Sequence, residues 1–197
     1  MSISKFIIFL SVFLYIFMFS KLVYSNDAVQ VSNNQSPIVL HDGLFGDGFP
    51  HRAMMDDNKL NRYFYGNWKN NKGFANFSSL QTKGFRVLTQ LGMIPKKVLK
   101  GWRVKNFKLG KKKSFKSSGN PAVVQLVTID GNSCFAIDTK FGASRDAKNR
   151  VTTGLSGFVC KYNDEFTIEE TINFVNCIEL IGDKNTVSKV VDISCSK

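Results

Sequence analysis

Ten basic side chains and no acidic one lie between Lys96 and Lys116, which makes this stretch the strongest candidate for binding a partner by charge. The basic residues are Lys96, Lys97, Lys100, Arg103, Lys105, Lys108, Lys111, Lys112, Lys113 and Lys116. A block of like charge repels itself, so it needs either solvent or an anionic partner. Apolar residues such as Trp102 and Phe107 are interleaved with the cations. That mixture indicates a folded segment rather than a flexible tail.

Alternation of apolar and basic residues predicts that some of the cations share one solvent-facing surface. The predicted anion-binding residues are Arg103, Lys105, Lys108, Lys111, Lys112 and Lys113. Such a surface attracts a sulfated glycan, a nucleic acid or an anionic membrane surface. A host protein is the alternative partner. The alternative is a solvated basic face that only keeps the protein soluble. No cofactor is predicted.

The two histidines of the chain, His41 and His51, offer acid–base chemistry in a glycine-rich loop. Several aspartates are nearby in sequence, so a metal site or a proton-transferring pair can be drawn. A histidine pair together with lysines suits RNA cleavage, and a small secreted hydrolase, in its most natural form a nuclease, is the alternative function. The spacing matches no catalytic motif, so we assign no catalytic residue and no metal, and a non-enzymatic role is the main expectation.

Four cysteines, Cys134, Cys160, Cys177 and Cys195, lie in the last third of the chain. An even number of cysteines behind a secretory signal predicts two disulfides, for which three pairings exist. Pairing Cys134 with Cys160 and Cys177 with Cys195 is preferred, because each bond closes a short loop. A zinc site is the competing interpretation, but no C-x-x-C pair and no neighbouring histidine supports it.

Residues 1–25 have the pattern of a signal peptide, with a basic start, an apolar run and small residues near the end. An uncleaved anchor is the alternative, although the apolar run is shorter than the about 20 residues of a membrane-spanning helix. Cleavage removes Lys5 and Lys21 and no acid, which leaves 25 basic and 15 acidic residues, a net charge of +10. We therefore expect a secreted protein, periplasmic if bacterial, with no transmembrane segment after cleavage.

After the signal peptide, the chain begins with a polar leader over residues 26–36, which we expect to be disordered. Leu60, Phe64 and Trp68 recur every four residues and predict a helix over about residues 58–68. A second helix is predicted over residues 78–91, and Pro95 is expected to end it.

The remainder of the chain is predicted to be β-rich. A strand is expected over residues 102–109, and Lys111 to Lys113 are expected to form a turn. Runs over residues 122–129 and 133–139 flank Asp130-Gly131 and predict a hairpin. Further strands are predicted over residues 155–162 and 187–194, and residues 165–181 fit either a helix or a strand pair.

The pattern as a whole predicts an α+β protein with one domain over residues 37–197. Its helical part spans residues 37–95, and its β-rich part, a small sandwich or barrel-like unit tied by disulfides, spans residues 96–197. The expected function is that of a secreted binding or host-interaction protein that uses its basic face. A surface component whose β edges pair with a partner chain is a further alternative.

Overall fold

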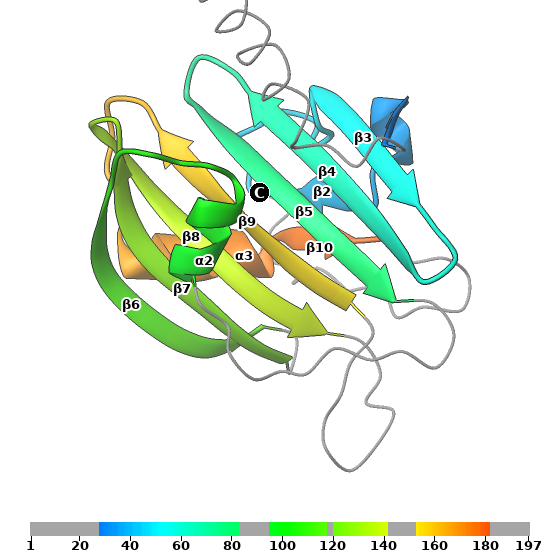
Figure 1. The fold of residues 1–197 in the computed structure, drawn as a ribbon. Helices are drawn as coiled ribbons and strands as arrows, with labels where there is room; N and C mark the ends of the chain where they lie inside the picture. Colours follow the sequence, from blue (N-terminus) through cyan, green and yellow to red (C-terminus); the bar gives the residue numbers. More distant parts are fainter. Residues whose placement is uncertain (1–27, 83–94, 118–119, 142–152, 182–197) are drawn as a thin grey trace, which may run out of the picture.

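An eight-stranded antiparallel sheet dominates the computed structural model, which describes residues 28–82, 95–117, 120–141 and 153–181 (Figure 1). The elements are β1 (Val29–Val31), η1 (Asn33–Gln35), β2 (Ile38–Leu40), β3 (Arg52–Asp57), β4 (Asn61–Lys69), β5 (Gly73–Thr82), α2 (Pro95–Gly101), β6 (Phe107–Ser117), β7 (Asn120–Ile129), β8 (Asn132–Phe141), β9 (Thr153–Lys161), α3 (Ile168–Asn176) and β10 (Ile178–Leu180). The α+β class is therefore present in the form of a sheet with two α-helices in the described part of the chain.

The sheet consists of two meanders joined along one seam. Its strand order is β1-β3-β4-β5-β9-β8-β7-β6, so β3 to β5 form one meander and β6 to β9 the other. The seam is the antiparallel pair of β5 and β9. This order leaves β6 at one edge of the sheet, while β2 and β10 form a separate two-stranded ribbon.

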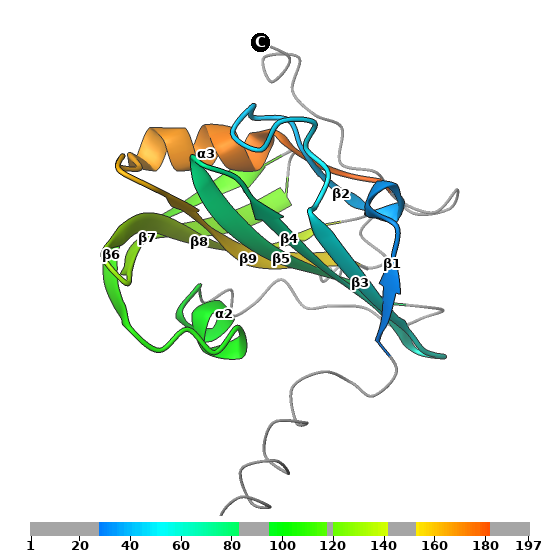
Figure 2. The same cartoon turned by 90° about the horizontal axis from the view of Figure 1, so that it is seen from above.

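Helices cover both faces of the sheet (Figure 2). Helix α3 and the β2–β10 ribbon lie on one face, where Phe64, Trp68, Phe77 and Phe135 are buried in the larger core. Helix α2 lies on the opposite face, and its Leu99 is buried in a smaller apolar cluster. The sheet is therefore the central layer, with the larger core on its α3 side and the smaller apolar cluster on its α2 side.

The predicted helix over residues 58–68 is wrong, because this segment contains most of β4. Side chains four residues apart share one face of a helix, but they also share one face of a strand. Phe64 and Trp68 are buried on the same face of β4, and Gly66 lies between them on that face. Leu60 precedes the strand and is 45% exposed. The fourfold spacing was therefore compatible with both structures.

Other N-terminal predictions also need correction. Residues 78–82 of the predicted second helix belong to β5, and its remainder lies outside the described residues. Pro95 begins α2 instead of ending a helix. Proline is well tolerated at the first helical position, because the N–H group that it lacks would have no hydrogen-bond partner within the helix. The expected disordered leader contains β1, which pairs with β3, and η1. Among the described residues of the predicted helical part over residues 37–95, the regular structure up to Thr82 is strand, and α2 begins only at Pro95.

The hairpin of β7 and β8 is confirmed, with Asp130 and Gly131 at its turn. Both residues have positive φ angles, 47° and 85°, as the tight turn between two strands requires. The strand predicted over residues 155–162 corresponds to β9. The strand predicted over residues 187–194 and the signal peptide over residues 1–25 lie outside the described residues.

The segment over residues 165–181, for which a helix or a strand pair was predicted, forms a helix followed by a single short strand. Helix α3 begins after Thr167, whose hydroxyl accepts a hydrogen bond from the backbone N–H of Glu170. The Glu170 carboxylate accepts one from the Thr167 N–H in return, which completes a capping box. After the helix, residues Ile178–Leu180 form β10 against β2.

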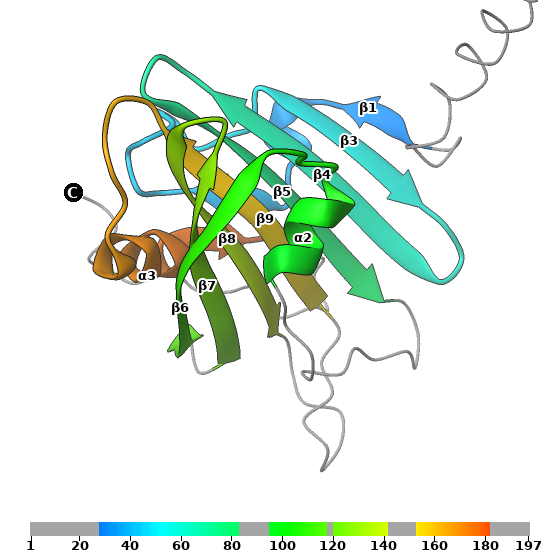
Figure 3. The same cartoon turned by 60° about the vertical axis from the view of Figure 1, so that its left-hand side comes forward.

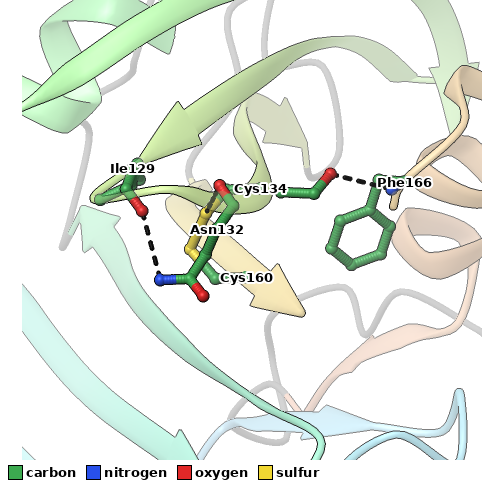
Figure 4. The surroundings of a disulfide bond; sticks show 6 residues. Ile129, Asn132, Cys134, Cys160 and Phe166 are labelled. Atoms are coloured by element: carbon green, nitrogen blue, oxygen red, sulfur yellow. Dashed lines mark hydrogen bonds between the residues drawn. A yellow bond between two sulfur atoms is a disulfide. The ribbon is translucent and has the colours of Figure 1, made fainter. Parts of the chain in front are cut away.

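One disulfide joins Cys134 and Cys160, as predicted. These residues lie directly opposite each other on β8 and β9, with Cα atoms 4.0 Å apart, and both are fully buried. Figure 4 shows the bond beside the β7–β8 turn, where the Asn132 side-chain amide donates to the Ile129 carbonyl at 3.3 Å. The other predicted pair, Cys177 with Cys195, includes a residue outside the described part of the chain.

Candidate anion-binding surface

Helix α2, the turn after it and strand β6 carry all ten cations of the Lys96–Lys116 stretch, and every one of these side chains is exposed. We call this set the basic surface. The six predicted anion-binding residues are included in it. Three lysines on α2, Lys96, Lys97 and Lys100, were not among those six. They belong to the same charge run in the sequence, but the helix that presents them was not predicted.

Strand β6 includes the lysine triplet that was predicted to form a turn. Lys111, Lys112 and Lys113 lie inside the strand, next to an irregularity in the pairing with β7 between Leu109 and Lys112. This β-bulge absorbs the extra residue while the strand continues. The prediction of a turn is therefore wrong, and the triplet extends along the edge of the sheet.

The lysines of β6 project from both faces of the sheet, because successive side chains of a strand alternate between its faces. Directly opposite residues on neighbouring strands share a face. Lys113 lies opposite Val124, which is buried in the core on the α3 side. Lys112 lies opposite Gln125, two residues from Val127 in the cluster beneath α2. The cations therefore follow the rim of the sheet, and the single basic face expected from the sequence is replaced by a basic edge.

Acidic residues are excluded from a long part of the chain around the basic surface. No aspartate or glutamate occurs between Asp57 and Asp130, a range that includes β4, β5, α2, β6 and β7. Four acidic residues instead gather at the start of α3, namely Asp164, Glu165, Glu169 and Glu170. Since α3 and α2 cover opposite faces (Figure 2), the cations of α2 lie away from this acidic helix end.

Arg103 occupies an unusual backbone position at the end of α2. Its φ angle is 56°, in the left-handed region that favours glycine. The Val104 N–H donates to the Leu99 carbonyl and the Arg103 N–H to the Lys100 carbonyl, both at 3.0 Å. These two bonds form a Schellman motif, in which the left-handed residue is usually glycine. The chain thus places a long cation where the backbone alone would favour Gly.

The two histidines lie in different surroundings. The His41 imidazole Nε2 is 2.7 Å from the Glu179 carboxylate of β10. His51 donates its backbone N–H to the Asn67 carbonyl at 2.7 Å, and it lines a surface cavity with Asp47. Among the contacts of the described residues, none joins His41 to His51. The geometry therefore gives no support for an acid–base pair.

A second cluster of charges surrounds Lys161 at the end of β9. Its ammonium lies 2.9 Å from Asp164 and 3.2 Å from Glu170, and 4.6 Å from the centre of the Phe166 ring. Burial lowers the pKa of Lys161, but the hydrogen bonds to these two carboxylates outweigh it and leave the pKa raised. The same bond to Lys161 lowers the pKa of Asp164. Lys161 thus links β9 to the start of α3, a structural role.

Asp42 lines a cavity of about 470 Å³ beside this cluster. Burial raises the pKa of its carboxyl to about 6, although the Leu44 N–H donates to it at 3.3 Å. No group of at least three potential metal-ligating side chains occurs among the described residues.

Comparisons with protein-family models, with curated proteins and with solved structures found no match. Within the described ranges, none of the helices has the length and apolar character needed to cross a membrane.

Proposed function

We propose that the protein is a secreted binding protein whose basic surface engages an anionic macromolecule. The observation that carries this proposal is the exposure of all ten cations along α2 and β6, in a part of the chain without any acidic residue. Exposed like charges repel one another, and an anionic polymer relieves that repulsion while releasing its own counterions.

The shape of the basic surface suits a linear partner. Strand β6 has 11 residues, which corresponds to about 35 Å at about 3.3 Å per residue. Its cations project from both faces of the sheet rim, so a chain that runs along the rim meets positive charge on either side. A compact acidic ligand would contact only a few of them.

A structural role for the same lysines is the competing explanation. Lysines and bulges on an edge strand prevent it from pairing with another copy, and β6 has both features. That role requires charge on the edge strand, but it does not require the cations of α2 or of the turn that follows. The exclusion of acids from Asp57 to Asp130 also extends well beyond the edge.

The test compares two variants that lose the same charge at different places. One replaces Lys108, Lys111, Lys112 and Lys113 of β6 with glutamine. The matched control replaces Arg52, Lys59, Lys69 and Lys72 with glutamine, and these four are also exposed. Binding to immobilised heparin and to single-stranded DNA is measured between about 50 and 200 mM salt, the range over which phosphate-contacting proteins lose affinity steeply.

We expect the β6 variant to lose most of its affinity and the control to retain it. For DNA, the slope of log affinity against log salt falls by up to about 3 for the four lost contacts, at about 0.7 for each phosphate on a single strand. Equal losses in both variants would show that net charge alone attracts the polymer. Binding by the wild type that does not depend on salt would also refute the proposal.

A further inference from the structure

A cavity of about 480 Å³ lies between α2 and the sheet, next to the basic surface. Figure 3 shows α2 over this face of the sheet. The volume of this cavity falls within the range of about 300 to 1,000 Å³ that is typical of small-molecule sites. The sheet provides its floor and α2 with the following turn provides its roof. We call it the α2 cavity.

The floor of the α2 cavity is one row of side chains across four neighbouring strands. Tyr65 of β4 lies opposite Ser78 of β5, Ser78 lies opposite Ser156 of β9, and Ser156 lies opposite Asp138 of β8. Directly opposite residues share a face, and neighbouring strands are about 4.8 Å apart. The row therefore extends for about 14 Å, with an aromatic ring at one end and a carboxylate at the other.

The row is polar and borders the apolar cluster beneath α2. Ala136 and Phe158, two positions along the same strands, are buried in the cluster that contains Leu99. The Ser78 and Ser156 hydroxyls are 3.1 Å apart and only half-buried. The Ser78 hydroxyl is also 3.4 Å from the Ser156 carbonyl. When Ser78 donates to that carbonyl and the Ser156 hydroxyl donates to Ser78, both hydroxyl donors are used. Three of the four acceptor lone pairs of the two hydroxyls then remain for hydroxyl donors of a ligand.

The roof adds an aromatic ring and two cations. Trp102 is fixed by edge-to-face contacts with Tyr65 and Phe158, with ring centroids 6.3 and 6.2 Å apart. Lys97 and Arg103 line the cavity and are exposed. The left-handed backbone at Arg103 thus turns the chain at the cavity itself.

We propose that the α2 cavity binds one acidic sugar residue of a glycan, carboxylated or sulfated. This inference rests on the proposed function and specifies its ligand: the glycan chain runs along the basic surface and inserts one residue beneath α2. Hydroxyl groups of the sugar donate hydrogen bonds to the side-chain oxygens of Ser78, Ser156 and Asp138. The aromatic rings contact its apolar face, and Lys97 and Arg103 attract its acidic group.

The oxygen acceptors of the cavity floor favour a sugar over DNA. The carboxylate of Asp138 and the hydroxyls of Ser78 and Ser156 accept hydrogen bonds from the several neighbouring hydroxyl donors that a sugar carries. DNA has no such hydroxyls. The presence of a carboxylate at the end of the floor, beside a surface rich in cations, matches a ligand that is anionic and also rich in hydroxyl groups.

The test removes the floor hydroxyls without a change of charge. The double variant Ser78→Ala, Ser156→Ala is compared with Ser114→Ala, a serine that is exposed on β6. The probes are a heparin hexasaccharide, an unsulfated hexagalacturonate and a single-stranded DNA of similar charge. Calorimetry measures the affinities, and thermal unfolding verifies that each variant is folded.

We expect the double variant to bind at least one of the two acidic hexasaccharides about tenfold more weakly than the wild type does, which corresponds to the loss of one or two hydrogen bonds. Its DNA affinity stays that of the wild type, and Ser114→Ala changes neither. Loss with heparin alone identifies a sulfated sugar, and loss with hexagalacturonate alone identifies a carboxylated one.

Two other outcomes separate the two proposals. If the β6 lysine variant loses its affinity for heparin but the double serine variant binds every probe as the wild type does, the α2 cavity is not a sugar site and the proposed function stands. If the double variant weakens DNA and glycan equally, the cavity does not distinguish them and the inference is wrong. If the wild type binds no polyanion, the proposed function itself fails.

Discussion

Replacement of Arg103 by glycine and by alanine separates the cost of its backbone conformation from the role of its side chain. Both variants remove the guanidinium and whatever interactions it makes, so these losses cancel in the comparison. At a φ of 56° an L-residue with a Cβ atom costs about 1–2 kcal/mol, whereas glycine adopts this conformation freely. The larger backbone entropy that glycine loses on folding offsets part of that difference. We therefore expect Arg103→Gly to be more stable than Arg103→Ala by about 1 kcal/mol.

Urea unfolding, followed by tryptophan fluorescence, measures this difference. In a chain of this size, about 1 kcal/mol corresponds to about 2–4 °C in Tm. Lys105 provides the control, since it is exposed and is not among the described residues with positive φ. There the order reverses, and Lys105→Ala is at least as stable as Lys105→Gly. Equal stability of the two Arg103 variants would refute the strain argument.

Two further predictions concern Asp42 and the disulfide between Cys134 and Cys160. The raised pKa of Asp42, from 3.8 to about 6, means that the folded protein keeps a proton that the unfolded chain releases, so stability falls as pH rises from about 4 to about 6. The variant Asp42→Asn removes this fall. Urea unfolding should show that its free energy of unfolding at pH 7 is higher than that of the wild type by up to about 3 kcal/mol, and that this gain disappears below pH 4. A gain that does not depend on pH would contradict the raised pKa of Asp42. The Cys134→Ala, Cys160→Ala variant loses about 3 kcal/mol, because the bond closes a loop over a sequence separation of 26 residues. Calorimetry should show a Tm lower by about 6–12 °C, and a fall under 2 °C would mean that packing alone holds β8 to β9.

The parts of the fold that the sequence predicts correctly are those fixed by local chemistry. Asp130 and Gly131 specify a tight turn through their own backbone preferences, and the strands beside them follow. The pairing of Cys134 with Cys160 could be predicted because this bond closes a short loop. The prediction of a helix over the β4 segment was wrong because the spacing of Phe64 and Trp68 fits the period of a helix and that of a strand equally well.

The candidate site depends on contacts that no local pattern contains. Its cations are evident from the sequence, but the bulge at Leu109 and Lys112 decides which face each one occupies. The row of Ser78, Ser156 and Asp138 exists only because β5 pairs with β9. These residues are separated by long stretches of chain, so their register cannot be read from spacing.

The central place of β9 has a consequence for the order in which the sheet is assembled. Its pairs with β5 join residues separated by 161 − 73 = 88 and 153 − 81 = 72 positions, while its neighbours in the second meander are far closer in sequence. Local hairpins close faster than distant pairs, so the two meanders form first and meet last. Until then β5 is an open edge of ten residues without a single charge, which invites pairing with other chains. Loss of β9, by truncation or by a failure to close the seam, would therefore leave the uncharged edge of β5 open to aggregation, whereas the lysines of β6 protect the edge that β6 forms.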